Sequence, residues 1–410
     1  MYGHNRAAGL RLRLAPAYDV QASDFGQPMD LSYIINHLGE ARERYAGAVA
    51  PPIWQTTMFA HHSVAAMRTA LADEYGHAVY TRGNNPTTAI LRAKLAALEG
   101  AEDALVFGSG AAAVAAAVLG SVRAGDHVVA VEKPYAWTKT LLRTWLPRFG
   151  VEVMFVDARE TANVEAALRP ATRAIVLESP NSLTFEQQDL TAIASLARQR
   201  GIRTICDNSY ATPLGQTPLA HGIDIVVHSA TKYLAGHSDV LAGVVCASEA
   251  ICREIFAGPF MTFGALLSPH DAWLVLRGLR TFPVRMERVA ATTAKVVAYL
   301  EAHPKVGRLH YPQSERYPQR ELTKRQLAHA SGLLSIELDG VERFCDALGR
   351  FLMSASWGGH ESLAFPVAGV RDWRGHEHHA SVPVRLVRLS IGLEDADVLI
   401  ADLDQALAKI

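Results

Sequence analysis

From about residue 88 onward, short apolar runs alternate with amphipathic stretches of helix length, and this alternation limits the possible folds more than any other feature. Strands that alternate with helices are typical of βαβ units, in which a parallel sheet is buried on both faces. The apolar runs lie at 104–107, 127–131, 151–156, 174–178, 203–206, 223–227 and 242–247. The sequence therefore predicts an α/β domain with a mostly parallel sheet.

The pattern changes after Pro259. Helical periodicity dominates residues 269–302, strand-like runs follow at 333–338 and 384–392, and an amphipathic helix is expected at 395–410. These elements predict a smaller C-terminal α+β domain. We expect an N-terminal segment at 1–65, a large domain at 66–262 and a small domain at 263–410.

Charge and composition exclude several classes of protein. The 410 residues carry 40 basic and 41 acidic side chains, so there is no broad basic face for nucleic acid or an anionic membrane. The four cysteines form no CxxC pair, which indicates free thiols in a reducing cytoplasm. Residues 104–122 are uncharged, but Gly108 and Gly110 favour a strand, a turn and a buried helix over a membrane span.

Ligands of parallel sheets bind beyond the carboxyl ends of the strands, so polar residues there are candidates for a site. Gly108, Ser109 and Gly110 follow the first run, where a new helix would offer free N–H groups to a phosphate. A plain tight turn remains an alternative. The dinucleotide pattern GxGxxG is incomplete, because Ala113 occupies the place of the third glycine.

Two other strand ends carry polar residues. Asp207 closes the run at 203–206, either as a turn former or as a carboxylate that keeps a ring nitrogen protonated. Lys232 follows the run at 223–227 between hydroxyl residues, and a partly desolvated lysine there can act as a Schiff-base nucleophile. Together, these three strand ends could hold a phosphate, a ring nitrogen and an aldehyde, which are the groups of pyridoxal phosphate.

The run SATKYLAGHSDVLAGVV at 229–245 resembles the lysine signature of the Cys/Met-metabolism family of pyridoxal phosphate enzymes. The resemblance extends over almost the whole chain from about residue 45, through YTRGNNPT at 80–87, SWGGHESL at 356–363 and the C-terminal run at 387–407. It implies a type I aminotransferase-like fold with bound pyridoxal 5'-phosphate. It also implies a homotetramer of two tight dimers, with the N-terminal segment against the neighbouring subunit.

The same resemblance implies roles around the cofactor. Lys232 matches the Schiff-base lysine, Asp207 the partner of the ring nitrogen, and Tyr135 the aromatic residue that stacks on the ring. Tyr80 and Arg82 match a pair that reaches the site from the neighbouring subunit, where Arg82 would bind phosphate. Lys232, Tyr135 and Tyr80 are the expected catalytic residues.

The resemblance also implies the phosphate and substrate contacts. Gly110 and Ala111 would give backbone N–H groups to the phosphate, and Ser229 and Thr231 would add hydroxyls. Arg388 matches the arginine that binds the substrate α-carboxylate, for which a bidentate guanidinium is suited, with Arg385 as its solvated neighbour. Other expected substrate contacts are Ser182, Ser356 and Trp357.

Subgroup features disagree about the reaction. Trp357 in SWGG and Ser182 are similar to bacterial cystathionine β-lyases, which predicts β-elimination of cystathionine or a related cysteine thioconjugate to a thiol, pyruvate and ammonia. YTRGNNPT looks more like the γ-enzymes, and Ala355 fits neither subgroup. Gamma-elimination or γ-replacement is therefore the alternative.

Two remaining interpretations concern other cofactors. A nicotinamide-dependent oxidoreductase could use the turn at Gly108, but it leaves Lys232, Asp207 and Arg388 unexplained. The cluster His376, Glu377, His378 and His379 reads as a solvated loop, so no metal is expected. The expected partner is a small-molecule amino-acid substrate, and the enzyme is expected to be cytoplasmic.

Overall fold

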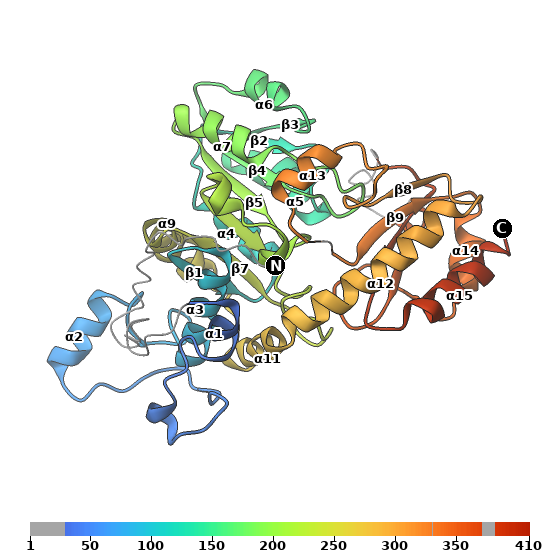
Figure 1. Cartoon of the computed structure of the whole chain (residues 1–410). Helices are drawn as coiled ribbons and strands as arrows, with labels where there is room; N and C mark the ends of the chain where they lie inside the picture. The colour runs from blue at the N-terminus through green and yellow to red at the C-terminus, as the bar shows by residue number, and fades with distance from the viewer. Residues whose placement is uncertain (1–28, 330, 371–381) are drawn as a thin grey trace.

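The computed structural model describes residues 29–329, 331–370 and 382–410. Within these ranges the chain forms a seven-stranded sheet and a five-stranded sheet, each covered by helices (Figure 1). The long helix α12 (Phe282–Ala302) runs from the side of the large sheet to the small one.

The large sheet has the strand order β1-β7-β6-β5-β4-β2-β3. Its strands are β1 (Asp103–Phe107), β2 (His127–Val131), β3 (Glu152–Val156), β4 (Thr172–Glu178), β5 (Arg203–Asp207), β6 (Ile225–His228) and β7 (Gly243–Ala247). Strand β7 pairs antiparallel with β1 and β6, while the pairs from β6 to β3 are parallel. All seven apolar runs are thus strands, to within two residues at each end, and the mostly parallel sheet is confirmed.

Helices and short helical turns connect these strands. The helices are α1 (Leu31–Asn36), α2 (Val64–Ala72), α3 (Pro86–Glu99), α4 (Gly110–Leu119), α5 (Ala136–Thr140), α6 (Thr161–Ala167), α7 (Leu190–Gln199), α8 (Thr212–Gly215), α9 (Glu249–Ile255), α10 (Met261–Phe263), α11 (Pro269–Arg280), α12, α13 (Arg320–Gln326), α14 (Val341–Ala347) and α15 (Ala396–Leu407). Local signals set several of their ends. Asn85 caps α3 before Pro86, and Gly100 ends it with a left-handed φ of 71°.

The strands of the large sheet contribute side chains to two apolar cores, one on each face. Helices α3, α7 and α11 share one core, which contains Leu91, Ile193 and Val275. Helices α4 and α9 share the other, which contains Val114 and Ile255. Every residue of β2 is buried, as a strand covered on both faces requires.

The small sheet has the order β10-β11-β12-β9-β8. Its strands are β8 (Arg308–His310), β9 (Leu333–Glu337), β10 (Leu352–Met353), β11 (Leu363–Pro366) and β12 (Leu386–Ser390). A third apolar core joins it to α12, α14 and α15. Helix α11 instead packs on α3 beside the large sheet. The proposed domain limits at 65 and 262 stay predictions.

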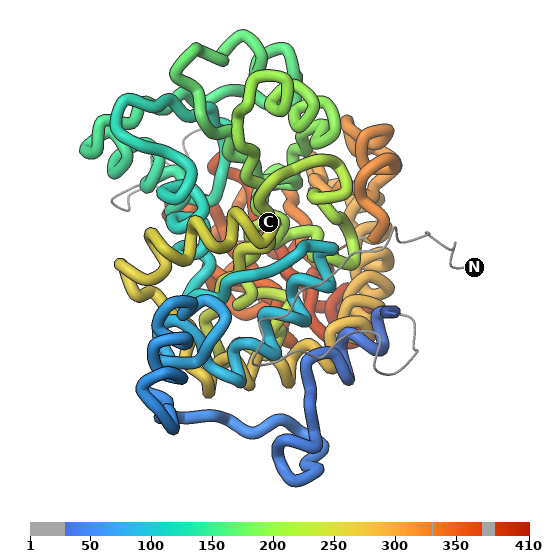
Figure 2. The backbone as a smooth tube through the Cα atoms, turned by 90° about the vertical axis from the view of Figure 1, so that its left-hand side faces the viewer, coloured from blue at the N-terminus to red at the C-terminus, as the bar shows by residue number. Residues whose placement is uncertain are grey.

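The described part of the N-terminal segment is fastened to α3 by a buried ion pair. The Lys94 Nζ lies 3.1 Å from Glu40 Oε1 and donates to the carbonyls of Ile34 and Ile35 at 2.9 and 2.8 Å. Beyond this anchor the chain runs outward to α2, which lies apart from the sheets at one end of the molecule (Figures 1 and 2).

The uncharged stretch at 104–122 folds as strand β1, a turn and helix α4. Across the described ranges, no helix combines the length and apolar character needed to cross a membrane. The four cysteines are buried and free, as expected.

The first prediction concerns Gly243, where β7 passes the start of α4. A Cβ added at Gly243 would lie 2.1 Å from the Ser109 carbonyl oxygen, so we expect Gly243→Ala to lower the free energy of unfolding by about 1–3 kcal/mol. The measurement is the apparent Tm of the purified protein. Gly369→Ala is the matched control, because its Cβ would meet Pro366 at an ordinary 3.7 Å. Equal Tm values for the two variants would contradict this account of the contact.

Candidate active site

A cavity of about 390 Å³ lies beyond the carboxyl ends of β4, β5 and β6, closed on the far side by residues of the small sheet. Its lining residues include all but two of those predicted from the sequence, namely Gly110, Ala111, Tyr135, Ser182, Asp207, Ser229, Thr231, Lys232, Ser356, Trp357 and Arg388. Tyr80 and Arg82 do not line it. The cavity therefore gathers residues that are as much as 279 positions apart in the chain, from Ser109 to Arg388.

One wall is the N-terminus of α4. Ser109 caps the helix, and its Oγ accepts the N–H of Ala112 at 3.1 Å. The N–H groups of Gly110 and Ala111 precede the first bonds of the helix and point outward. A Cβ at Gly110 would lie 2.7 Å from the Cβ of Ser229, so only glycine fits here. This geometry forms a small anion cradle between two loops.

Thr231 takes a different position from the one expected. Its hydroxyl donates to the carbonyl of Ala242 at 3.1 Å and accepts the Ala242 N–H at 2.9 Å. This exchange pins the loop that carries Lys232. To donate to a phosphate, the Thr231 hydroxyl would have to break its hydrogen bond to the Ala242 carbonyl.

Lys232 lines the cavity. Its Nζ donates to Ser356 Oγ at 2.7 Å and lies 5.3 Å from the centre of the Trp357 ring. Burial and the nearby Arg388 lower the pKa of Lys232 to about 8, while Asp207 acts in the opposite direction. A larger share of neutral amine is therefore present near neutral pH than in an ordinary lysine.

Two carboxylates face the cavity from neighbouring strand ends. Asp207 and Glu178 are paired in the register of β5 and β4. The Ser209 N–H donates to Asp207 Oδ1 at 2.9 Å. Burial raises the pKa of Asp207, against the hydrogen bonds from Ser209 and the charge of His228, which lower it. A cationic ring nitrogen beside Asp207 would favour its charged form.

Glu178 is a site residue that the sequence interpretation missed. Its two oxygens accept the N–H groups of Tyr135 at 2.5 Å and Ser182 at 3.0 Å, so it joins two loops that line the cavity. Burial and Asp207 raise the pKa of Glu178 to about 8. The signal was available, since Glu178 closes a buried strand just as Asp207 does.

Arg388, on β12, forms the opposite wall. Its guanidinium donates to the carbonyls of Ser182 at 3.1 Å and Ala355 at 3.0 Å, and it packs 5.0 Å from the Phe365 ring. Burial lowers its pKa to about 10. Among the described residues it has no carboxylate partner, so an anionic ligand would supply the missing charge. Arg385 is half exposed and paired with Glu337.

Tyr135 and Trp357 flank the cavity. Trp357 is buried against the Tyr233 ring at 5.4 Å, whereas 45% of Tyr135 is exposed. Burial of its hydroxyl, Glu178 and Asp207 raise the pKa of Tyr135, which keeps its phenol protonated. The Tyr135 backbone N–H is bonded to Glu178, and its exposed ring can cover a planar ligand in the cavity.

Tyr80 and Arg82 lie elsewhere on the surface. Tyr80 pairs with Met58 in an isolated bridge and is 43% exposed, with the Arg82 guanidinium 5.6 Å from its ring. Neither residue lines the cavity of its own chain. The cluster at His376–His379 lies outside the described residues.

The cavity suits pyridoxal phosphate. It offers an anion cradle that only a glycine permits, an amine with a lowered pKa, and the carboxylate of Asp207 in the same cavity. These groups match the phosphate, the aldehyde and the ring nitrogen of that cofactor. Arg388 remains available for a carboxylate.

The family model for Cys/Met metabolism PLP-dependent enzymes matches residues 33–408. An L-methionine gamma-lyase of Pseudomonas putida is 38% identical over 379 residues, which are 90% of this chain and 95% of the relative. A cystathionine gamma-lyase of Bacillus subtilis is 37% identical over 388 residues, covering 91% of this chain and 98% of the relative.

A solved structure is similarly close. The cystathionine gamma-lyase from Lactobacillus plantarum, complexed with L-serine, superimposes with a TM-score of 0.85 at 32% identity. The match covers 93% of this chain and 99% of the other. The fold expected from the sequence is therefore confirmed.

The second prediction concerns Glu178→Gln. Glutamine keeps the shape but has one acceptor oxygen, so one of the two backbone N–H groups would face its NH₂ group. Such an unsatisfied donor costs about 1–3 kcal/mol, and we expect kcat/KM to fall roughly tenfold or more. The assay is steady-state turnover, with near-UV circular dichroism of the bound cofactor as a second readout. The exposed Glu321→Gln is the control, and unchanged values for Glu178→Gln would show that Glu178 does not position these loops.

Proposed function

The chain belongs to the Cys/Met metabolism family of PLP-dependent enzymes, and we propose that within this family it catalyses γ-elimination from a thioether amino acid such as L-methionine. Such a reaction would consume water and release a thiol, 2-oxobutyrate and ammonia. The observation that carries the proposal is the γ-type activity named for relatives that match 90% or more of the chain. They favour this alternative over the β-elimination expected from Trp357 and Ser182.

A smaller cavity next to the candidate active site supports an uncharged substrate tail. It measures about 170 Å³, shares Tyr135, Ser182, Ala355 and Arg388 with the main cavity, and has mostly apolar walls. The apolar lining comprises Pro134, Ala136, Trp137, Leu183, Phe365, Val370 and Val382. Lys133 also lines this cavity but is paired with Glu186 at 2.7 Å. The described lining includes no carboxylate for the second ammonium group of cystathionine, so a short thioether is the better match.

Arg388 would anchor the substrate. A guanidinium binds a carboxylate through two parallel hydrogen bonds, and Arg388 is held in place by the carbonyls of Ser182 and Ala355. Arg388 lines both cavities, so a substrate whose α-carboxylate is bound there would have its α-carbon in the cavity of Lys232 and its side chain in the smaller cavity.

Proton transfers then fall to Lys232 and Tyr135. The bound cofactor supplies an electron sink that makes the α- and β-protons of the substrate acidic. The Lys232 amine, with a pKa lowered to about 8, can accept such a proton near neutral pH. Asp207 would hold the proton on the ring nitrogen. Tyr135, whose raised pKa keeps its hydroxyl protonated, can donate to the departing sulfur.

We also propose that the site is completed by a second copy of the chain. Tyr80 and Arg82 lie outside the cavity of their own chain, on a segment rich in exposed apolar residues. The exposed side chains of that segment are Val49, Ile53, Trp54, Met58, Val64, Met67, Leu71 and Tyr80. An apolar surface of this extent is typical of an interface, and a homotetramer built from such dimers is the assembly we expect.

The third prediction identifies the product. We expect the purified protein to form 2-oxobutyrate from L-methionine, with a thiol in equal amount. Lys232→Ala is the negative control and should lose about 10²–10⁴-fold or more in kcat, because the proton acceptor is removed. Pyruvate from L-cystathionine, without 2-oxobutyrate from L-methionine, would overturn the proposal in favour of β-elimination.

The fourth prediction tests the shared site by complementation. Lys232→Ala and Arg82→Ala should each be nearly inactive alone. Refolded or co-expressed together they form mixed dimers with one intact site, and about a quarter of wild-type activity should return. The double variant carrying both changes in one chain is the control and should restore nothing when mixed with either parent. Failure of the mixture to regain activity, with mixed dimers shown by mass spectrometry, would place Arg82 outside the neighbouring site.

A further inference from the structure

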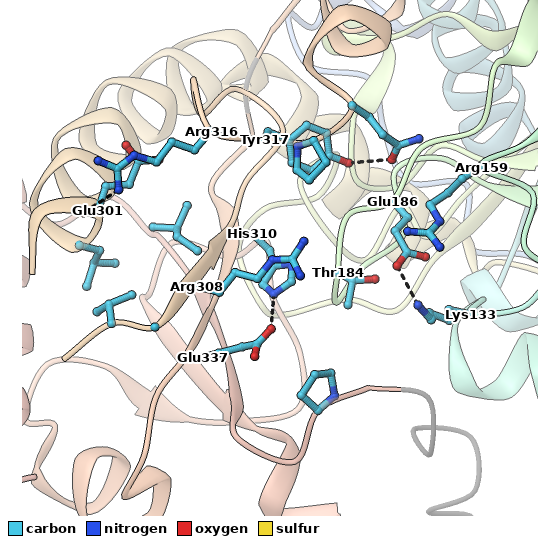
Figure 3. Close-up of a pocket in the computed structure, with 17 residues that line it drawn as sticks. Lys133, Arg159, Thr184, Glu186, Glu301, Arg308, His310, Arg316, Tyr317 and Glu337 are labelled. Carbon is cyan, nitrogen blue, oxygen red and sulfur yellow. Dashed lines mark hydrogen bonds and ion pairs between the residues drawn. The ribbon is translucent and has the colours of Figure 1, made fainter. Parts of the chain in front are cut away.

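A second cavity, of about 460 Å³, lies between the two sheets and outside the candidate active site (Figure 3). One wall follows the ends of strands β2, β3 and β4 and carries Lys133, Arg159 and Glu186. It therefore shares the carboxyl edge of the parallel sheet with the active site, and ligands of such sheets bind along this edge. The opposite wall comes from the small sheet.

The carboxylates in this cavity already have partners. Glu186 Oε1 lies 2.7 Å from the Nζ of Lys133. Glu337 is bonded through one oxygen to His310 at 2.8 Å and through the other to Arg385 at 2.9 Å. Glu301 accepts the hydroxyl of Ser314. Glu186 and Glu337 are thus paired with cations, whereas the partner of Glu301 is a neutral hydroxyl.

The cations are less well satisfied. Arg308, at the start of β8, makes no ion pair or side-chain hydrogen bond with any residue of the described ranges. Arg316 donates only to the backbone carbonyl of Glu301, at 3.3 Å. Arg159 uses Nε and Nη2 for Asp157 at 2.8 and 2.5 Å, which leaves Nη1. Guanidinium donors thus remain on both walls.

The frame around these groups is firmly built. Tyr317 OH donates to the carbonyl of Phe185 at 2.5 Å, and Gln319 exchanges hydrogen bonds with the backbone of Gln187 at 2.8 and 2.9 Å. These bonds join the loop before α13 to the loop after β4. In Figure 3, Glu301 and Arg316 lie on one side of Arg308, and Lys133 and Glu186 lie on the other.

We propose that this cavity binds a small oxyanion, the phosphate or carboxylate group of a metabolite, with Arg308 as its main ligand. Lys133 and Arg159 are paired with Glu186 and Asp157, whereas Arg308 and Arg316 have no carboxylate partner in the described ranges, so an entering anion meets two unpaired guanidinium groups. Guanidinium groups recognise both oxyanions through paired N–H donors. The volume is within the range of small-molecule sites.

The fifth prediction is tested with the holoenzyme, in which the cofactor's own phosphate occupies the cradle at Gly110. Inorganic phosphate is titrated by calorimetry, with chloride keeping the ionic strength constant. We expect saturable binding that Arg308→Gln weakens roughly tenfold or more, because a charge-assisted hydrogen bond is lost. Arg343→Gln, an exposed arginine of the same domain outside the cavity, is the matched control and should bind as the wild type does.

A second series uses malonate in place of phosphate. Whichever anion shows the stronger dependence on Arg308 identifies the source of the oxyanion. An anion bound at the substrate arginine, Arg388, would still bind to the Arg308→Gln variant, so this variant distinguishes the active site from the second cavity. If Arg308→Gln does not fold, Arg316→Gln carries the same test. Absence of saturable binding, or equal binding by the wild type and both cavity variants, would overturn the proposal.

Discussion

The candidate active site depends on the electrostatics of four ionisable side chains that line one cavity. Burial lowers the pKa values of Lys232 and Arg388 and raises those of Asp207 and Glu178. Buried charges persist only where hydrogen bonds compensate the lost water. Backbone carbonyls do this for Arg388, and backbone N–H groups do it for both carboxylates. The loops at the strand ends are therefore the structural basis of the proton chemistry proposed for Lys232.

Close backbone approach is the second requirement of the site. The start of α4 lies so near Ser229 that Gly110 cannot carry a side chain, and β7 lies even nearer to Ser109 at Gly243. These contacts bring the N–H groups of one loop and the hydroxyl of another to the same point. An anion cradle of this kind needs no charged side chain from its own chain, since the helix end supplies the positive potential.

Periodicity predicted the strands of the large sheet to within two residues, because buried strands must be apolar on both faces. Periodicity could not predict that β7 runs antiparallel, since a pattern of apolar residues does not indicate the direction of a strand. Motifs predicted Lys232, Asp207 and Arg388 as neighbours. Glu178 was missed, because its importance comes from its pairing with Asp207 across two strands and from the backbone N–H of Tyr135, 43 residues away in the chain.

The reaction type, like the fold, was predicted only in part from the sequence. Motifs around Lys232 identified the family, whereas Trp357 and Ser182 pointed to β-elimination and the relatives point to γ-elimination. By itself the sequence determined the alternating elements, the cofactor and the residues at the strand ends, because these follow from local pattern and short motifs. Only the tertiary structure decided which carboxylates face each other, which arginines lack partners and where the second cavity opens. Those properties arise from contacts between distant segments, which no local pattern records.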